Sequence, residues 1–140
     1  MSSRSKVEEQ KVAQQAPISL ELACSALKEL WSPRVVGQVN NQYIKVAKVQ
    51  GEFPWHSHED EDEMFLVLRG LLCIGREEGD GGPVSLRAGE FFVVPRGVRH
   101  NTSAVEETWV ALIETTTTLH TGSEQTALTR SIAEQLGTTS

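Results

Sequence analysis

Short apolar runs rich in β-branched and aromatic residues fill the middle of the chain, and polar turn residues separate them. The seven runs are VVGQV, QYIKVAKVQ, EMFLVLRG, LLCIG, PVSLR, GEFFVVP and TWVALIE. Turn signals such as Asn40-Asn41 and Gly79-Asp80-Gly81-Gly82 lie between them. Their spacing is typical of an antiparallel sandwich or barrel and not of alternating strands and helices. The pattern therefore predicts an all-β fold.

The segments on either side of these runs have other patterns. Residues 1–16 are polar, which favours a flexible N-terminal arm. Helical spacing between residues 17 and 31 predicts one short helix. The residues that carry this spacing are Leu20, Ala23, Leu27 and Leu30. Residues 123–140 have weak helical spacing, so we expect a C-terminal tail or short helix there and a single domain over residues 17–122.

Composition narrows the classes of partner. The 140 residues, 39% of them apolar, are enough for one hydrophobic core without a disulfide. A net charge of −6 disfavours nucleic acid as a partner, because phosphate binding needs clustered Lys and Arg. No apolar run approaches the ~20 residues of a membrane span, and no secretory signal precedes the domain. We therefore expect a soluble, cytoplasmic protein that binds a small molecule.

Candidate chemistry is concentrated in GEFPWHSHEDEDEMFLVLRG, residues 51–70. His56 and His58 stand one residue apart, so on a strand both would point the same way, and a carboxylate from the neighbouring strand can join them. His100, in the later segment GEFFVVPRGVRHN, adds a third imidazole from another strand. Such a nitrogen and oxygen donor set suits one divalent Fe, Mn, Ni, Co or Zn ion with open positions. A charged, solvated loop is the alternative for the acidic run Glu59 to Glu63.

Two spaced motifs carry a family resemblance. Gly51-x4-His56-x-His58-x4-Glu63-x6-Gly70 and Gly89-x5-Pro95-x-Gly97-x2-His100 resemble the first and second motifs of the cupin superfamily. The chain is most similar to small single-domain cupins of the cupin 2 type, in the group labelled mannose-6-phosphate isomerase-like. The resemblance implies a double-stranded β-helix, or jelly-roll, barrel over about residues 35–117. It also implies that His56, His58, Glu63 and His100 hold one divalent metal ion.

Glu63 is preferred over Asp62 because it alone keeps the six-residue spacing to Gly70. Phe65 and Val67 share its strand face and can form an apolar pocket wall. Further candidate pocket residues are the aromatic side chains on or near the same strands, Tyr43, Phe53, Trp55 and Phe92. His120 lies outside both motifs, and we expect it at the surface or at the mouth of the site.

Met64, Leu66 and Leu68 present a second apolar face on the strand that carries Glu63. A strand buried on both faces predicts a homodimer formed by sheet packing, which the cupin resemblance also implies. Two functions stay open. The first is an enzyme, with dioxygenase chemistry if the metal is iron, and with isomerase, lyase or decarboxylase chemistry if it is zinc, nickel or manganese. The second is a module that binds a small ligand or metal without turnover.

Overall fold

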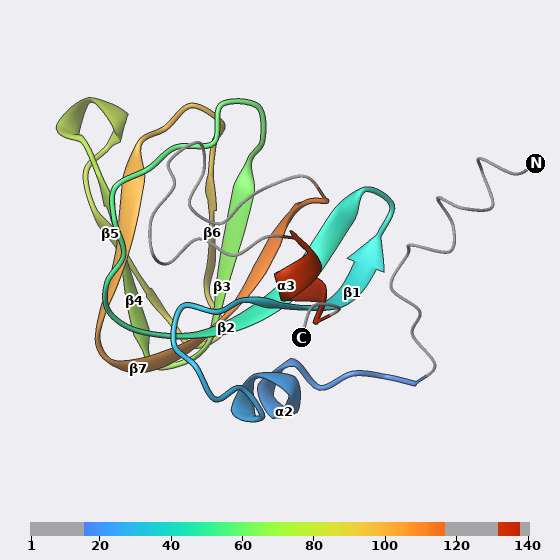
Figure 1. The fold of residues 1–140 in the computed structure, drawn as a ribbon. Helices are drawn as coiled ribbons and strands as arrows, with labels where there is room; N and C mark the ends of the chain where they lie inside the picture. The colour runs from blue at the N-terminus through green and yellow to red at the C-terminus, as the bar shows by residue number, and fades with distance from the viewer. Residues whose placement is uncertain (1–15, 117–131, 138–140) are drawn as a thin grey trace, which may run out of the picture.

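The computed structural model describes residues 16–116 and 132–137, and within them the chain forms a jelly-roll of antiparallel strands with two short flanking α-helices (Figure 1). The elements, in chain order, are α2 (Leu20–Ser25), β1 (Arg34–Val39), β2 (Gln42–Glu52), β3 (Glu63–Arg69), β4 (Leu71–Arg76), the 3-10 helix η1 (Glu78–Asp80), β5 (Val84–Arg87), β6 (Phe91–Val94), β7 (His100–Thr115) and α3 (Ile132–Leu136). The all-β, cupin-type fold predicted from the sequence is confirmed.

The 16-residue strand β7 organises the sheet. It pairs with β2 and β3, which gives the strand order β1-β2-β7-β3-β6, and its first residues also pair with β4, which in turn pairs with β5. β2 lies along one edge of β7, and β4 and β3 pair with successive parts of its other edge. Since β7 begins at His100 and runs the length of the barrel, it connects the candidate site to the core.

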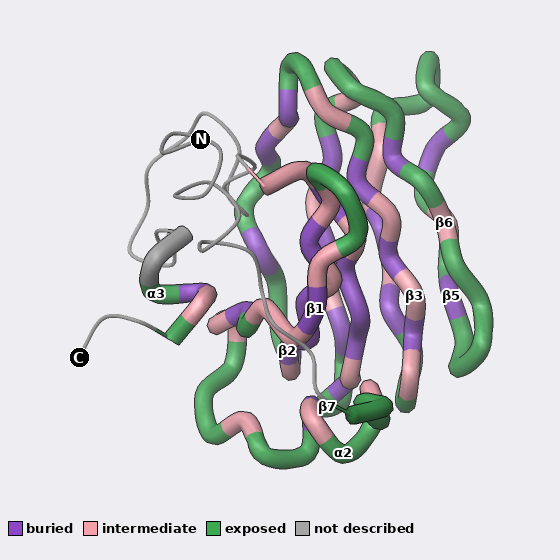
Figure 2. Tube along the Cα trace, turned by 90° about the vertical axis from the view of Figure 1, so that its right-hand side faces the viewer, coloured by how far each residue is buried: buried purple, intermediate pink, exposed green. Residues whose placement is uncertain are grey.

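Side chains alternate between the barrel interior and its outer surface. Figure 2 shows buried positions alternating with less buried ones along β3, where Glu63, Phe65 and Val67 face inward. The hydrophobic core consists of the inward-facing residues Ala47, Val49, Phe65, Val67, Leu72, Ile74, Leu86, Val94, Ala104, Val110 and Leu112. Glu63 therefore stands at one end of an interior that is otherwise apolar along the same strand.

Two elements differ from the sequence prediction. The last strand begins at His100 and not at Thr108, because its polar first half pairs with β4 and β2 through backbone hydrogen bonds that hydrophobic periodicity does not report. The first helix ends at Ser25, well before Trp31. Lys48 Nζ donates to the carbonyl oxygens of Ser25 and Leu27, which satisfies carbonyl groups where the helix stops.

The predicted domain limits are only partly covered by the structure. Nearly all of the arm predicted at 1–16 and the domain end predicted at residue 122 lie outside the described residues, so these limits stay a prediction. Within the predicted tail the structure describes α3, which lies against β1. No helix in residues 16–116 or 132–137 is long and apolar enough to cross a membrane.

Candidate metal centre

Four side chains that the sequence singled out meet inside the barrel. His56, His58, Glu63 and His100 each offer one ligand atom, and these atoms all lie within 4.8 Å of one another. The four residues are buried, with 0–6% of their surface exposed. A group of three imidazoles and one carboxylate with this closeness could bind a metal ion. Their individual roles as ligands stay a prediction.

The backbone brings His56 and His100 together directly. His56 N donates to His100 O at 2.9 Å, and His100 N donates to His56 O at 2.8 Å. This pair forms an isolated antiparallel bridge, and the two ring centres are 4.4 Å apart. His56 and His100 belong to different motifs and lie 44 positions apart in the sequence, and this backbone pairing brings them together.

The expectation that His56 and His58 alternate along one strand is wrong. Strand β2 ends at Glu52, and the segment from there to Glu63 is irregular apart from the bridge at His56. Pro54 has no backbone N–H to continue a ladder, which favours leaving the strand at this point. His58 is held instead by its carbonyl oxygen, which accepts a hydrogen bond from Gly97 N at 2.8 Å. Both imidazoles still reach the interior.

Backbone carbonyl groups orient two of the imidazoles. His56 Nδ1 lies 2.9 Å from Pro54 O, and His100 Nδ1 lies 3.0 Å from Val98 O. A protonated Nδ1 that donates to a carbonyl leaves Nε2 with a free lone pair, as in metal-ligating histidines. His100 Nε2 is fully buried and makes no hydrogen bond of good geometry within the described residues, although Glu63 Oε1 is 3.4 Å away. A divalent ion would satisfy this orphaned nitrogen.

Burial and charge set the protonation of the cluster. Burial, followed by the effect of His100, lowers the pKa of His56 to about 4, so this imidazole is neutral at pH 7. Burial disfavours charge on His58 as well, but its contact with Glu63, 3.1 Å from Nε2 to Oε1, outweighs burial and raises the pKa. Burial alone would raise the pKa of Glu63, but the rings of His100 and His58 hold it well below its usual range. Glu63 is therefore an ionised carboxylate.

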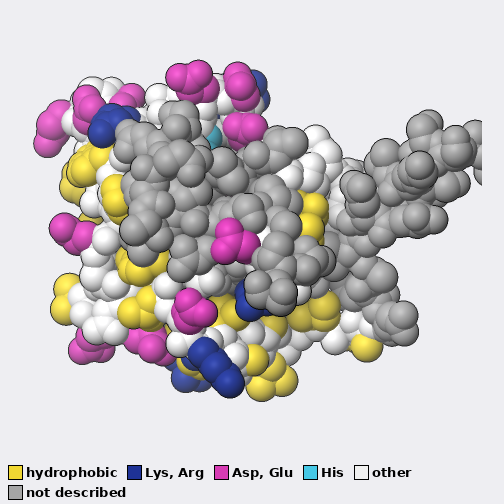
Figure 3. Space-filling view, in the orientation of Figure 1, with side chains coloured by type: hydrophobic (Ala, Val, Ile, Leu, Met, Phe, Trp, Pro, Cys, Tyr) yellow, Lys and Arg dark blue, Asp and Glu magenta, His cyan; other side chains and the backbone are white. Residues whose placement is uncertain are grey.

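The neighbouring acidic residues point elsewhere. Asp62 is exposed, and its Oδ1 accepts a hydrogen bond from Arg96 N at 2.9 Å. Glu59 and Asp60 are also exposed, in the loop before β3. Figure 3 shows acidic side chains gathered along the upper edge of the molecule, where part of a histidine is visible. A negative rim of this kind attracts cations towards the site and repels anions.

A second polar group inside the barrel escaped the sequence analysis. Lys45 of β2 and Glu114 of β7 are both fully buried, with Nζ 2.8 Å from Oε1, and Lys45 Nζ also donates to Gln135 Oε1 of α3. Burial, followed by the charge of Glu63, raises the pKa of Glu114 well above its usual range. The signal in the sequence was a charged residue at an inward position of two otherwise apolar strands. Lys45 and Glu114 thus connect the C-terminal helix to the neighbourhood of Glu63.

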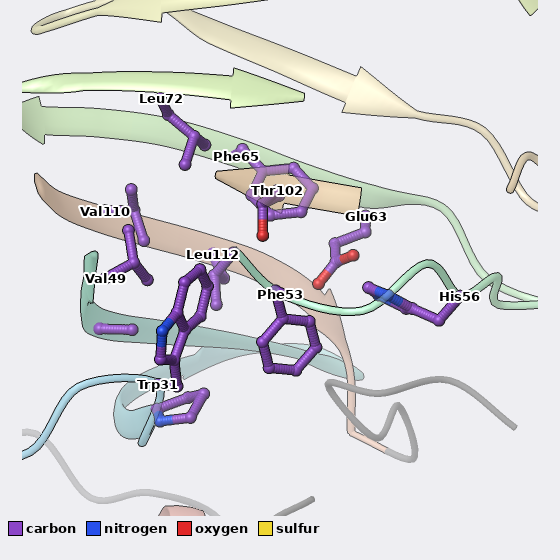
Figure 4. Close-up of a pocket in the computed structure, with 12 residues that line it drawn as sticks. Trp31, Val49, Phe53, His56, Glu63, Phe65, Leu72, Thr102, Val110 and Leu112 are labelled. Carbon is purple, nitrogen blue, oxygen red and sulfur yellow. The ribbon is translucent and has the colours of Figure 1, made fainter. Parts of the chain in front are cut away.

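The predicted pocket residues separate into two groups. Phe53 and Phe65 line a pocket beside His56 and Glu63 (Figure 4). The other four lie elsewhere: Tyr43 is buried near Lys45, Trp55 is 37% exposed, Val67 belongs to the core, and Phe92 packs under Arg76. Trp31, which the sequence assigned to a structural helix, lines the pocket instead. His120 lies outside the described residues.

Comparisons with known proteins agree with the fold. Residues 43–123 match the family described as cupin domain. The uncharacterized protein YdbB of Bacillus subtilis is 32% identical over 82 residues, which cover 59% of this chain and 71% of that protein. Auxin-binding protein ABP20 of Prunus persica is 31% identical over 83 residues, which cover 53% of this chain and 39% of that protein. A crystal structure of a cupin-2 domain containing protein from Shewanella frigidimarina superposes with a TM-score of 0.66 at 40% identity, covering 70% of this chain and 93% of that one.

Proposed function

The chain belongs to the cupin domain family, and from this premise we propose that it is a metal-dependent enzyme acting on a small oxygen-bearing molecule. The observation that carries the proposal is the buried cluster of His56, His58, Glu63 and His100, whose ligand atoms lie within 4.8 Å of one another. Burying four such groups without an ion would leave polar atoms unsatisfied, as His100 Nε2 already is among the described residues. One divalent Fe, Mn, Ni, Co or Zn ion fits this donor set.

The residues of the chain have distinct tasks in this proposal. The carbonyl oxygens of Pro54 and Val98 fix the rings of His56 and His100, so that each Nε2 is directed into the cluster. Glu63 supplies the negative charge. A bound divalent ion would polarise an oxygen atom of the substrate as a Lewis acid. Iron would favour dioxygenase chemistry, whereas zinc, nickel or manganese would favour isomerase, lyase or decarboxylase chemistry.

Turnover by the metal-loaded full chain tests the proposal. The protein is loaded separately with each of the five metals and incubated with a panel of sugars, keto acids and phenols. We expect one metal to support product formation from at least one class, with loss of activity after chelation and recovery when that metal is restored. Absence of product across the panel with every metal would contradict an enzymatic role.

A second candidate function is a module that binds a small ligand without turnover. The Prunus persica relative is named for binding auxin, which favours this alternative, although the chain spans only 39% of that protein. A ligand that binds only the folded state raises the melting temperature in proportion to the logarithm of its concentration. A melting-temperature shift that depends on metal, with no product after prolonged incubation, would favour the module over the enzyme.

The outer face of the sheet supports a homodimer. Met64 and Leu66 of β3 pair with Val93 and Phe91 of β6, so their four side chains share one face. Phe91 is 60% exposed and Val93 is 41% exposed. Contiguous apolar surface on a sheet face is typical of an interface, and we propose a second copy of this chain as the partner. Light scattering at micromolar concentration should give a dimer for the native chain and a monomer for Phe91→Glu, whereas a monomeric native chain would overturn the idea.

A further inference from the structure

A small pocket lies beside the candidate metal ligands, in the interior of the barrel (Figure 4). His56 and Glu63 form one side of it, and Thr102 supplies the other polar side chain among the described lining residues. All the remaining described lining residues are apolar. In Figure 4, Val49, Leu72 and Val110 lie across the pocket from His56. The pocket therefore has a polar side at the cluster and an apolar side away from it.

Trp31 lines the apolar side and is held there by its backbone and side-chain contacts. Its backbone φ of 57° lies in the left-handed region, which costs a residue with a bulky side chain about 1–3 kcal/mol. Its backbone N donates to Lys48 O at 2.8 Å, and its indole Nε1 donates to Gln50 O at 2.9 Å. The indole packs on Phe53 with ring centres 4.9 Å apart. Two hydrogen bonds to β2 thus fix an aromatic wall that the local backbone alone would not favour.

The size and chemistry of the pocket restrict what can enter it. Its volume of about 40 Å³ has room for about three water-sized groups. Among the described lining residues no Lys or Arg is present, so a phosphate group inside the pocket would be buried without a positive partner. Additional hydroxyl groups beyond the reach of Thr102 would likewise lose their hydrogen bonds to water. An alkyl group of matching size has neither penalty.

We propose that this pocket is a side-chain subsite, so that the molecule bound at the cluster has an oxygen-bearing head and a short apolar tail of about three carbons. The inference rests on the proposed function, because the head is assigned to the metal centre. Trp31 is the residue that limits the length of the tail. Burying each methylene group strengthens binding about fourfold, so a three-carbon tail should improve affinity about sixtyfold over the head alone.

Straight-chain 2-oxo acids provide a graded probe of the pocket. The full chain is loaded with Co²⁺, and dissociation constants are measured by calorimetry for glyoxylate, pyruvate, 2-oxobutanoate, 2-oxopentanoate, 2-oxohexanoate and 2-oxooctanoate. The acids from pyruvate onward share the same ketone and carboxylate head and differ only in tail length, whereas glyoxylate, an aldehyde that is largely hydrated in water, serves as the reference without a tail. We expect affinity to rise about fourfold per carbon up to 2-oxopentanoate and then to stop rising.

Three variants locate the tail. Trp31→Ala should weaken binding of 2-oxopentanoate and move the limit to longer acids, because it opens the apolar end. Trp55→Ala is the matched control, since Trp55 is 37% exposed and does not line the pocket. Ala47→Val narrows the pocket from inside and should move the limit to shorter acids. Ala47→Val keeps the test available if Trp31→Ala does not fold. The metal content of each protein is measured as well.

The outcomes separate this inference from the proposal on which it rests. Metal-loaded protein that binds glyoxylate but shows no gain along the series, or that binds no acid at all, overturns the tail subsite and leaves the metal centre standing. A limit that is the same in Trp31→Ala, Ala47→Val and Trp55→Ala as in the native chain also overturns it. A chain that takes up no metal overturns the proposed function and this inference together.

Discussion

Replacing Lys45 by methionine removes the positive charge that faces Glu114 inside the barrel. In the native chain Lys45 Nζ lies 2.8 Å from Glu114 Oε1, and neither side chain has any exposed surface. Methionine keeps a stem of similar length, so the change removes mainly the charge and the hydrogen bond to Gln135. We expect Lys45→Met to lower the free energy of unfolding, by an amount that grows with pH.

The magnitude follows from the protonation of Glu114. Burial raises the pKa of this carboxyl group, the charge of Glu63 raises it further, and Lys45 opposes both effects. Lys45 therefore limits the rise, and removing it raises the folded pKa of Glu114 further. A folded pKa above the unfolded one gives stability that is complete below the unfolded pKa and is lost as pH rises. From an unfolded pKa of about 4.3, keeping Glu114 protonated in the folded state costs at most about 4 kcal/mol at pH 7 and about 1 kcal/mol at pH 5. Because the pKa of Glu114 is already raised in the native chain, the loss caused by the substitution is the part of this cost that Lys45 prevents.

Urea denaturation of the metal-free protein between pH 5 and pH 7 measures this loss. Lys28→Met is the matched control, because Lys28 is exposed and the same substitution there should change stability by less than about 0.5 kcal/mol. The double variant Lys45→Met, Glu114→Gln should regain most of the stability, since it removes the stranded carboxyl group. No loss of stability at pH 7, or a loss that does not grow between pH 5 and pH 7, would refute the reasoning.

Two further predictions concern the cluster and the turns. Metal occupancy after dialysis should fall on acidification from above the ordinary imidazole pKa, because Glu63 raises the pKa of His58 and each proton bound there competes with the ion; occupancy that stays constant down to pH 4 would contradict this. Gly70→Ala should lower the melting temperature more than Gly51→Ala, since both glycines have positive φ but only at Gly70 would a Cβ meet Thr108 Oγ1, at 2.5 Å. Equal melting temperatures would show that the contact with Thr108 has no effect.

Much of the fold could be predicted from the sequence, because buried strands appear in it as short apolar runs. The apolar runs predicted all seven strands, and Glu63, Phe65 and Val67 face inward as their alternation required. The first half of β7 contains no apolar run of this kind. Its residues from His100 onward are mostly polar and are held by backbone pairing with β4 and β2, which depends on the partner strands and not on local composition.

The candidate ligands were identified for reasons that were partly wrong. Motif spacing selected His56, His58 and His100, but the strand alternation invoked for the first two does not exist in the structure. The rings are brought together by the backbone bridge between His56 and His100 and by the hydrogen bond from Gly97 N to His58 O. Long-range pairing of this kind is invisible to periodicity, so the spacing predicted the residues without predicting how they are held.

Residues whose roles depend on contacts between distant parts of the chain could not be predicted from the sequence. Trp31 stands at the end of the segment predicted as a short helix, and its left-handed backbone and its hydrogen bonds to β2 place it in the pocket wall instead. Lys45 and Glu114 are 69 positions apart in sequence, and each alone is most often a surface residue. Their burial results from the pairing of β2 with β7, which the sequence pattern does not report.

The most direct test of the metal centre is elemental analysis of the native chain, His58→Ala and His120→Ala after identical dialysis. His58 belongs to the buried cluster, whereas His120 was placed outside it by both motifs and lies outside the described residues. We expect about one divalent ion per chain in the native protein and in His120→Ala, and most of the metal to be lost from His58→Ala, because removing a ligand weakens the site. Full occupancy in His58→Ala would contradict the assignment of the cluster as the metal site.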